Sequence, residues 1–295
     1  ANECKDKCSI KPEMVRIFPL IFILLWSSAF ITTKPIIDNS DPFAALAFRF
    51  FFVAIGFYLF AIYSNHSIVV NKKNFVESFF SGVLFHGFYL GGVFYSISIG
   101  MPTGIAALIV TLQPVLTNIL SGPILNEKVT FHQWIGVLLG FMGAAIVLGL
   151  DIGSDIPVLG LIATIVALIS ITASTIWQKK LSNNLPLTIS NFYQAIGGCS
   201  FHIIIIIFFT EPYIYFTKTF VIAMSHQIFL VSFGAFTILM FLIKKNSASK
   251  TVSIFFLIPA TSALMAWFFL NESLTLIDLI GFLITTIGVY IATRD

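Results

Sequence analysis

A few polar side chains stand inside otherwise apolar stretches of this sequence. Arg49 is the seventh residue of a run that starts at Phe43, and His86 and Tyr89 stand in the middle of another run. An arginine offers a planar fork of N–H donors to a carboxylate or phosphate, and a histidine changes charge near neutral pH, so it can couple a substrate to protons. If these runs cross a membrane, each buried ionisable group costs about 2.5–3.5 kcal/mol and is therefore a candidate for function.

Each ionisable candidate also has a structural interpretation. Arg49 would pair with Asp38 or Asp41, or cap helix carbonyls. His86, the only histidine that we place near the membrane centre with a tyrosine beside it, would be a hydrogen-bonded packing residue. Lys34 either adds a second cation to the site or extends its ammonium group to the membrane interface.

Aromatic and proline-bearing segments supply further candidates for a cavity wall. Trp26, Trp177 and Trp267 fall inside apolar runs, although with 33 Phe in the chain an aromatic side chain is more often in the core or facing lipid. Gln113-Pro114 and Pro259 are expected to break their helices and expose carbonyl groups, which lipid forbids unless they line a cavity or a helix contact. We expect at least a kink at each position, and ligand contact at Gln113 is the functional alternative.

The composition decides which solvent surrounds these residues. Of 295 residues, 58% are hydrophobic and only 10% are charged, and the mean hydropathy is +0.98. A soluble domain carries about 45–50% apolar and about 25% charged residues. Soluble enzymes, nucleic-acid binders and disordered scaffolds are thereby excluded, and the partners expected are the lipid bilayer and a small-molecule substrate. Three cysteines give no disulfide framework, and we expect no metal and no cofactor.

The apolar runs predict ten transmembrane helices, because about 20 apolar residues span a bilayer. Their lengths exclude the alternating strands of about ten residues that build outer-membrane barrels. The predicted fold class is an all-α polytopic membrane protein without a sizeable domain outside the lipid, and we interpret the first run as a retained helix rather than a signal peptide. The expected helices are 17–37, 43–63, 74–99, 102–125, 131–150, 157–178, 188–210, 220–243, 251–270 and 276–293.

The positions of the cations predict the orientation. If the N-terminus is cytoplasmic, thirteen Lys and Arg fall in cytoplasmic tails and loops and only Lys218 falls in an outer loop. Lys/Arg bias near helix ends sets topology. We therefore expect a multi-pass protein of the cell membrane, inner or plasma, with both termini cytoplasmic.

An internal repeat organises the chain. A shift of 145 residues superposes Leu125-Asn126-Glu127 on Leu270-Asn271-Glu272, and Pro114 on Pro259. Five helices per copy is an odd number, so the copies cross the membrane in opposite senses, and such inverted repeats place a binding site near the midplane. We expect a tail at 1–16 and repeats at 17–150 and 151–295. The same shift carries Arg49 onto Gln194, so we expect these two side chains to flank a shared central cavity.

The repeated motifs resemble a known family. The stretch from Gly104 through Gln113-Pro114 and Asn126-Glu127 to Gly143, together with its copy through Pro259 and Asn271-Glu272 to Gly288, is similar to the EamA-domain signature of the drug/metabolite transporter superfamily. The resemblance covers 17–293 and implies ten helices and transport of small metabolites or drugs, without choosing a substrate. One departure is Ser27, where glycine is commoner.

Two features of the motif have structural interpretations. Glu127 and Glu272 each precede a helix, and an acid there complements the positive helix end, so we expect both to be structural, like Pro114 and Pro259. Small residues in the fifth and tenth helices allow close helix approach. In the family these helices often form a dimer surface, so a homodimer and packing within one chain are both open. They are Gly136, Gly140, Gly143, Ala144, Gly281 and Gly288.

Missing motifs narrow the function. The sequence has no phosphate-binding loop, no His-Glu-x-x-His and no paired mid-membrane carboxylates, so ATP-driven pumping and intramembrane proteolysis are unsupported. We expect no enzyme but a secondary transporter of small organic metabolites, amino acids or related solutes, that works by alternating access. The alternatives are a multidrug or hydrophobic-cation efflux transporter, which would want a buried acid, and a membrane-embedded lipid-modifying enzyme.

Overall fold

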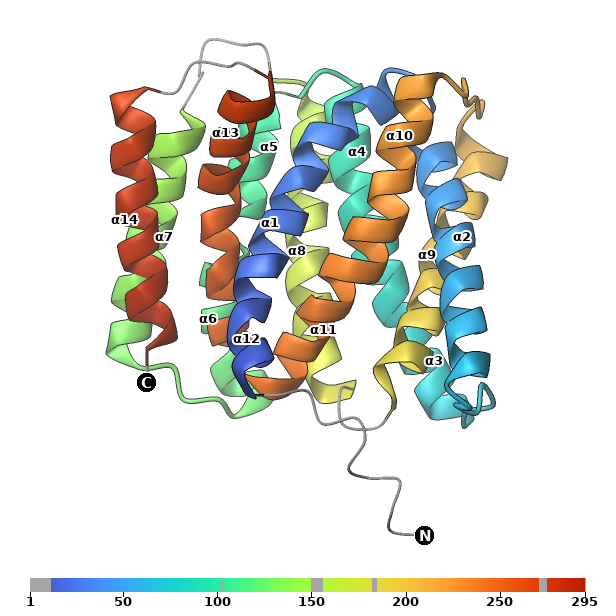
Figure 1. Ribbon diagram of the computed structural model, residues 1–295, viewed down its shortest axis with the longest axis horizontal. Coiled ribbons are helices and arrows are strands. Elements are labelled where there is room, and N and C mark those ends of the chain that lie inside the picture. Colours follow the sequence, from blue (N-terminus) through green and yellow to red (C-terminus); the bar gives the residue numbers. More distant parts are fainter. Residues whose placement is uncertain (1–11, 102, 150–155, 182–184, 271–274, 295) are drawn as a thin grey trace, which may run out of the picture.

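The protein, here as a computed structural model, is a bundle of helices standing side by side (Figure 1). The structure describes residues 12–101, 103–149, 156–181, 185–270 and 275–294. In this part of the chain ten segments are long and apolar enough to cross a membrane, which confirms the predicted number. The described residues contain no β-strand beyond one isolated bridge between Ser40 and Ile214. The first helix begins and the last helix ends at the same edge of the bundle, the lower edge in Figure 1.

Six spans are single helices and four are interrupted. The single helices are α1 (Pro12–Ile37), α2 (Pro42–Tyr63), α7 (Phe131–Leu148), α8 (Val158–Leu181), α9 (Leu187–Phe209) and α14 (Leu276–Thr293). The interrupted spans are α3 (Lys72–Gly82), η1 (Val83–Leu90) and α4 (Gly91–Ser98); α5 (Thr103–Val110) and α6 (Gln113–Leu125); α10 (Lys218–His226), η2 (Gln227–Ala235) and α11 (Phe236–Lys245); α12 (Ala248–Ser253), η3 (Ile254–Phe256) and α13 (Leu257–Leu270). The predicted limits lie within three residues of these, except that α1 starts five residues earlier.

The interruptions recur at the 145-residue spacing. The third and eighth spans each contain a π-helix, η1 and η2, and a shift of 145 carries 83–90 onto 228–235. The fourth span is broken between Val110 and Gln113, and the ninth contains the 3₁₀ turn η3 just before Pro259. A proline has no N–H and its ring displaces the preceding turn, so the predicted breaks at Pro114 and Pro259 are confirmed.

Helix starts repeat in the same register. Thr130 and Gln133 form a capping box at the start of α7, and Thr275 and Asp278 form one at the start of α14. Such a box satisfies free backbone N–H groups at a helix start. Because five spans separate the two starts, α7 runs upward in Figure 1 and α14 runs downward.

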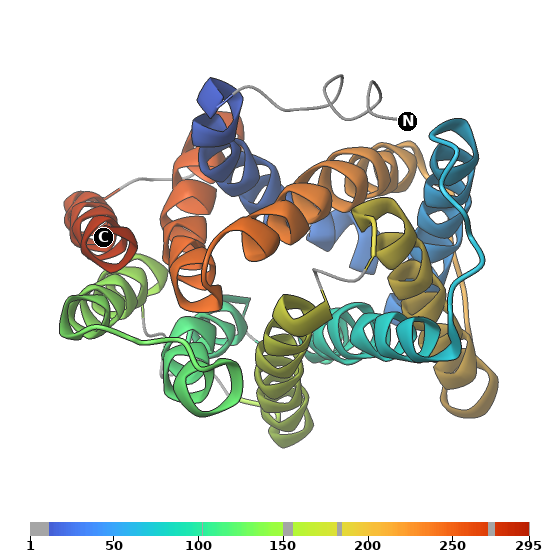
Figure 2. The ribbon, with the colours of Figure 1, turned by 90° about the horizontal axis from the view of Figure 1, so that it is seen from below.

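Helices α7 and α14 stand together at one end of the bundle (Figures 1 and 2). A side chain at Gly136 would collide with the backbone of Gly288 and Ala292, and one at Gly143 would collide with Gly281 and Thr285. Glycine is required here because the two backbones approach each other closely. The small residues of these helices therefore serve packing within one chain, one of the two uses left open by the sequence.

Candidate functional site

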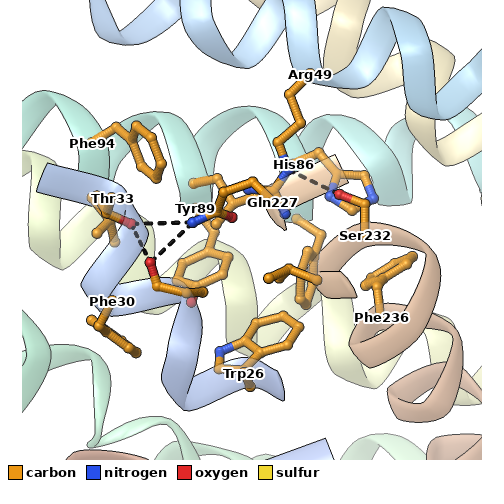
Figure 3. A pocket seen from close by; sticks show the side chains of 15 residues that line it. Trp26, Phe30, Thr33, Arg49, His86, Tyr89, Phe94, Gln227, Ser232 and Phe236 are labelled. Carbon is orange, nitrogen blue, oxygen red and sulfur yellow. Dashed lines mark hydrogen bonds between the residues drawn. The ribbon is translucent and has the colours of Figure 1, made fainter. Parts of the chain in front are cut away.

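A pocket of about 50 Å³ lies at mid-depth between α1, α2, η1, α4, η2 and α11 (Figure 3). We call it the polar pocket, because it gathers polar side chains from four of these segments, α1, α2, η1 and η2. Both π-helices contribute to its wall, and π-helical turns occur frequently at functional sites. The lining residues are Trp26, Ala29, Phe30, Thr33, Arg49, Phe85, His86, Tyr89, Leu90, Val93, Phe94, Gln227, Val231, Ser232 and Phe236.

Arg49 is the cation of the polar pocket, and it is only 5% exposed. Its Nε donates a hydrogen bond to the hydroxyl of Ser232 at 2.9 Å, and its guanidinium lies 5.3 Å from the ring centroid of Phe50. Among the described residues Arg49 has no acidic partner and no other hydrogen bond. The two Nη groups of the guanidinium therefore have no hydrogen-bond partner among the described residues, and the anion contact expected from the sequence stays a prediction.

The two acids considered as partners of Arg49 are used elsewhere. Asp38 pairs with Lys34, whose Nζ lies 2.9 Å from the carboxylate. Asp41 caps α2 by accepting a hydrogen bond from the backbone N–H of Ala44 at 2.8 Å. The alternative in which Arg49 pairs with either acid is therefore wrong.

His86 and Tyr89 enter the polar pocket from η1. They are 4% and 5% exposed, and Nδ1 of His86 is buried without a hydrogen-bond partner in the described structure. The backbone carbonyl of His86 accepts a hydrogen bond from Nε2 of His202, 3.0 Å away. His202 is fully buried on α9.

The sequence analysis placed only His86 near the membrane centre, but the structure places His202 beside it. His202 sits 15 residues beyond the start of α9, and this mid-span position is a signal that could have found it. A third histidine, His226, is the last residue of α10 and contacts two hydroxyls of α1, those of Ser28 at 3.0 Å and Thr32 at 3.3 Å.

Gln227 joins the start of η2 to α1 through hydrogen bonds of its side chain. Its Nε2 donates to the carbonyl of Ala29 at 3.0 Å and to the hydroxyl of Thr32 at 2.9 Å. Its Oε1 is buried without a partner in the described structure. No pattern in the sequence singled out Gln227 or Ser232, because both become neighbours of Arg49 only through the fold.

A wider cavity of about 430 Å³, which we call the wide cavity, adjoins the polar pocket. Trp26, Phe30, Tyr89 and Val93 line both spaces. The rest of its wall is mostly apolar and reaches the end of the bundle where α1 and α7 finish, with Lys34 at that edge: Ile31, Lys34, Ile97, Ala106, Ala107, Val110, Thr111, Val147, Leu148, Phe255, Ile258, Pro259, Ser262 and Ala263. The volume lies in the range of about 300–1,000 Å³ that is usual for small-molecule sites.

Four predicted site residues lie outside both spaces. Gln194 accepts a hydrogen bond from Nε2 of Gln178 at 2.9 Å and donates to Ser190, within a separate space of about 10 Å³. The shared cavity expected for Arg49 and Gln194 is therefore not formed, because the Gln194 amide is used up in the packing of α8 on α9. The repeat is symmetrical in backbone but not in the chemistry of its side chains.

The other three have equally clear positions. Gln113 is buried and donates to the hydroxyl of Thr175 at 3.0 Å. Trp177 and Trp267 are 42% and 50% exposed on the outside of the bundle, where aromatic side chains meet lipid. Only Trp26 of the three candidate tryptophans lines the pocket.

Polar contacts join the two halves at the end of the bundle where α1 begins and α14 ends. The carboxylate of Glu127 accepts the backbone N–H of Ala248 at 3.0 and 3.1 Å, at the start of α12. Glu127 thus caps a helix of the other half and not the next helix along the chain, which differs from the expectation. Next to it the hydroxyl of Ser249 binds the side-chain oxygen of Asn118. Glu272 lies outside the described residues.

Comparisons with known proteins agree on one family. The family model of the "EamA-like transporter family" matches residues 15–149 and again 158–294. The chain is 27% identical to "Uncharacterized transporter YvbV" of Bacillus subtilis, over 89% of this chain and 86% of that one. It is 21% identical to a "Probable amino-acid metabolite efflux pump" of Escherichia coli, over 93% of both. A solved crystal structure superposes with a TM-score of 0.79 at 17% identity, covering 95% of this chain and 97% of that one, which shows the fold.

Proposed function

The chain belongs to the EamA-like transporter family, and from this premise we propose that it is a secondary transporter of small organic metabolites, amino acids or related solutes, that works by alternating access. It is a membrane transporter by family. The substrate, the mechanism and the residues that bind the substrate are our proposals.

One observation supports the substrate class: Arg49, 5% exposed, faces a pocket in which no described residue carries a negative charge. A buried guanidinium without an acidic partner is costly, and a carboxylate is the group that its planar fork fits best. We propose that the substrate carboxylate binds Arg49. Tyr89, His86 and Gln227 would surround it, and the apolar part of the substrate would extend past Trp26 into the wide cavity.

Two observations support alternating access. The wide cavity reaches the bundle end away from the termini, while Glu127, Ala248, Asn118 and Ser249 are engaged with one another at the other end. Features that repeat at 145 residues sit on spans that run in opposite directions. We propose that 17–150 and 151–295 are the two inverted halves that exchange conformations, with 1–16 as a cytoplasmic tail, both termini cytoplasmic, and the cell membrane as the location.

The alternatives are less well supported. A hydrophobic-cation efflux transporter would require an acidic side chain to bind its substrate at the position where the structure has Arg49. A lipid-modifying enzyme would want converging polar groups at one membrane surface, whereas the polar pocket lies at mid-depth among the described spans. The prediction of a homodimer remains open.

The test is ligand-induced thermal stabilisation of the purified protein against a panel of amino acids and their 2-oxo acids. A ligand at 100 times its Kd stabilises the folded state by about 2.7 kcal/mol. We expect at least one compound to raise the Tm of the wild type and of Arg294→Gln, an arginine at the end of α14 that lies over Tyr290, but not of Arg49→Gln. If every compound that stabilises the wild type also stabilises Arg49→Gln equally, the proposed contact is wrong.

A further inference from the structure

The polar pocket carries an unbalanced positive charge. An arginine does not lose its proton in proteins, so Arg49 is a permanent cation at mid-depth. Four other cations have contacts elsewhere: Lys34 pairs with Asp38, Lys179 donates to the carbonyls of Ile243 and Asn246, and Lys245 and Arg294 lie over aromatic rings. Arg49 is the one that faces the pocket.

Six acids have side chains that the structure describes, and all six have other positions, so none of these six balances this charge. Four are bound to identified partners: Asp38 to Lys34, Asp41 to the start of α2, Glu127 to the start of α12, and Asp278 to the start of α14. Glu77 lies on α3 and Glu211 in the segment after α9, and neither lines the pocket. The remaining polar lining groups, among them His86, Tyr89, Gln227 and Ser232, carry no negative charge when their ordinary protonation states hold.

This imbalance constrains the transport cycle. The wide cavity adjoins the polar pocket, and we infer that water reaches the guanidinium from this side. To open towards the other end of the bundle the protein must first close this cavity, and the guanidinium then loses its water. A charge that is desolvated without a counter-ion is strongly disfavoured, whereas a guanidinium with a bound carboxylate is compensated. The loaded protein should therefore change conformation much more readily than the empty one.

The same imbalance bears on the charge of the substrate. A carboxylate neutralises Arg49, but the ammonium group of an amino acid would restore the excess positive charge, and no described acid is in place to receive it. The polar pocket, of about 50 Å³, accommodates a small polar group such as a carboxylate, and the wide cavity, of about 430 Å³ and with a mostly apolar wall, accommodates an apolar body.

From these observations we propose that the protein is an exchanger of organic anions, which carries apolar monocarboxylates such as 2-oxo acids and returns across the membrane only with another such anion bound to Arg49. This inference rests on the proposed function and specifies its substrate charge and its mode.

Proteoliposomes test it with two probes, a radiolabelled amino-acid mixture and the 2-oxo acid mixture made from it by an amino-acid oxidase. Each probe is added outside vesicles that contain either the same unlabelled mixture or buffer alone. We expect the 2-oxo acids to enter loaded vesicles at least about tenfold faster than buffer-filled ones, because each 1.36 kcal/mol of barrier is a factor of ten in rate. We also expect them to enter faster than the amino acids.

The outcomes separate this inference from the proposed function. Equal rates of entry into loaded and buffer-filled vesicles would overturn the proposed exchange. Entry of amino acids as fast as that of 2-oxo acids would overturn the proposed preference for anions. Under either outcome the protein would still be a transporter. If neither probe enters any vesicle faster than it enters protein-free vesicles, the proposed function itself fails.

Variants connect the requirement for exchange to Arg49. Arg49→Gln removes the charge, so its rates should be low but equal in loaded and buffer-filled vesicles. Arg49→Lys keeps the charge and should keep the dependence on loading, as should the matched control Arg294→Gln. If Arg49→Gln retains the wild-type ratio, the charge of Arg49 does not impose exchange. If Arg49→Gln does not fold, the ratio for the wild type and for Arg49→Lys still decides whether exchange is obligatory.

Discussion

The contact between Glu127 and α12 can be tested by removing the carboxylate. In the structure this half-buried carboxylate accepts the N–H of Ala248 at 3.0 and 3.1 Å. A hydrogen bond to a charged group contributes about 1.5–3 kcal/mol, and we take the lower limit because the carboxylate is partly exposed to solvent. Glu127→Ala should therefore make local opening at the start of α12 about tenfold more frequent. Glu127→Gln keeps an acceptor oxygen and should have a smaller effect.

Hydrogen exchange measures this opening directly. The readout is the exchange rate of a peptide that contains the Ala248 amide, followed by mass spectrometry on the protein in lipid nanodiscs. Glu77→Ala on α3 is the matched control, since this acid has no described contact with α12, and its exchange rate at Ala248 should equal that of the wild type. If Glu127→Ala also exchanges at the wild-type rate, the carboxylate does not hold this end of the bundle closed.

Three further changes have definite expected results. Gly136→Val should lower the free energy of unfolding by about 1–3 kcal/mol, because the new side chain collides with the backbone of α14. Gly122→Ala, with one neighbouring atom at 3.8 Å, should change the free energy of unfolding little. Chemical denaturation in detergent compares the two variants, and equal stability would rule out the close contact between α7 and α14. Trp26→Leu should weaken the binding of whichever panel compound stabilises the wild type, and Trp177→Leu should not, as measured by titrating the thermal shift; equal weakening would place the ligand outside the polar pocket. His202→Leu leaves the buried carbonyl of His86 without its donor and should destabilise the protein by about 1–3 kcal/mol, and a variant as stable as the wild type would show that the hydrogen bond from His202 contributes nothing.

The ten spans and their breaks could be predicted because they depend on local composition. A run of about 20 apolar residues has few alternatives to a membrane-spanning helix, and the breaks close to Pro114 and Pro259 follow from the missing N–H and the bulky ring of proline, although Pro19 and Pro35 lie within the single helix α1. The π-helices could not be predicted in this way. They arise from a shift in the backbone hydrogen bonds, and no residue type in Val83–Leu90 or Gln227–Ala235 predicts that shift.

The site was predicted only in part, for a related reason. Arg49, His86, Tyr89 and Trp26 could be selected one by one, since each is costly or conspicuous within an apolar run. Their neighbours Ser232 and Gln227 stand about 180 residues away from Arg49 in the sequence and meet it only in the folded bundle. Gln194 was selected by symmetry, and the structure shows why symmetry misled: its amide hydrogen-bonds to Gln178 on a neighbouring helix.

The most direct test is an experimental structure of the protein with the strongest stabilising compound of the amino-acid and 2-oxo acid panel. We predict that its carboxylate lies within hydrogen-bonding distance of the Arg49 guanidinium and that its apolar part extends past Trp26 and Tyr89 into the wide cavity. A ligand bound elsewhere, with the Arg49 guanidinium still contacting only Ser232 and Phe50, would contradict the proposed transport site.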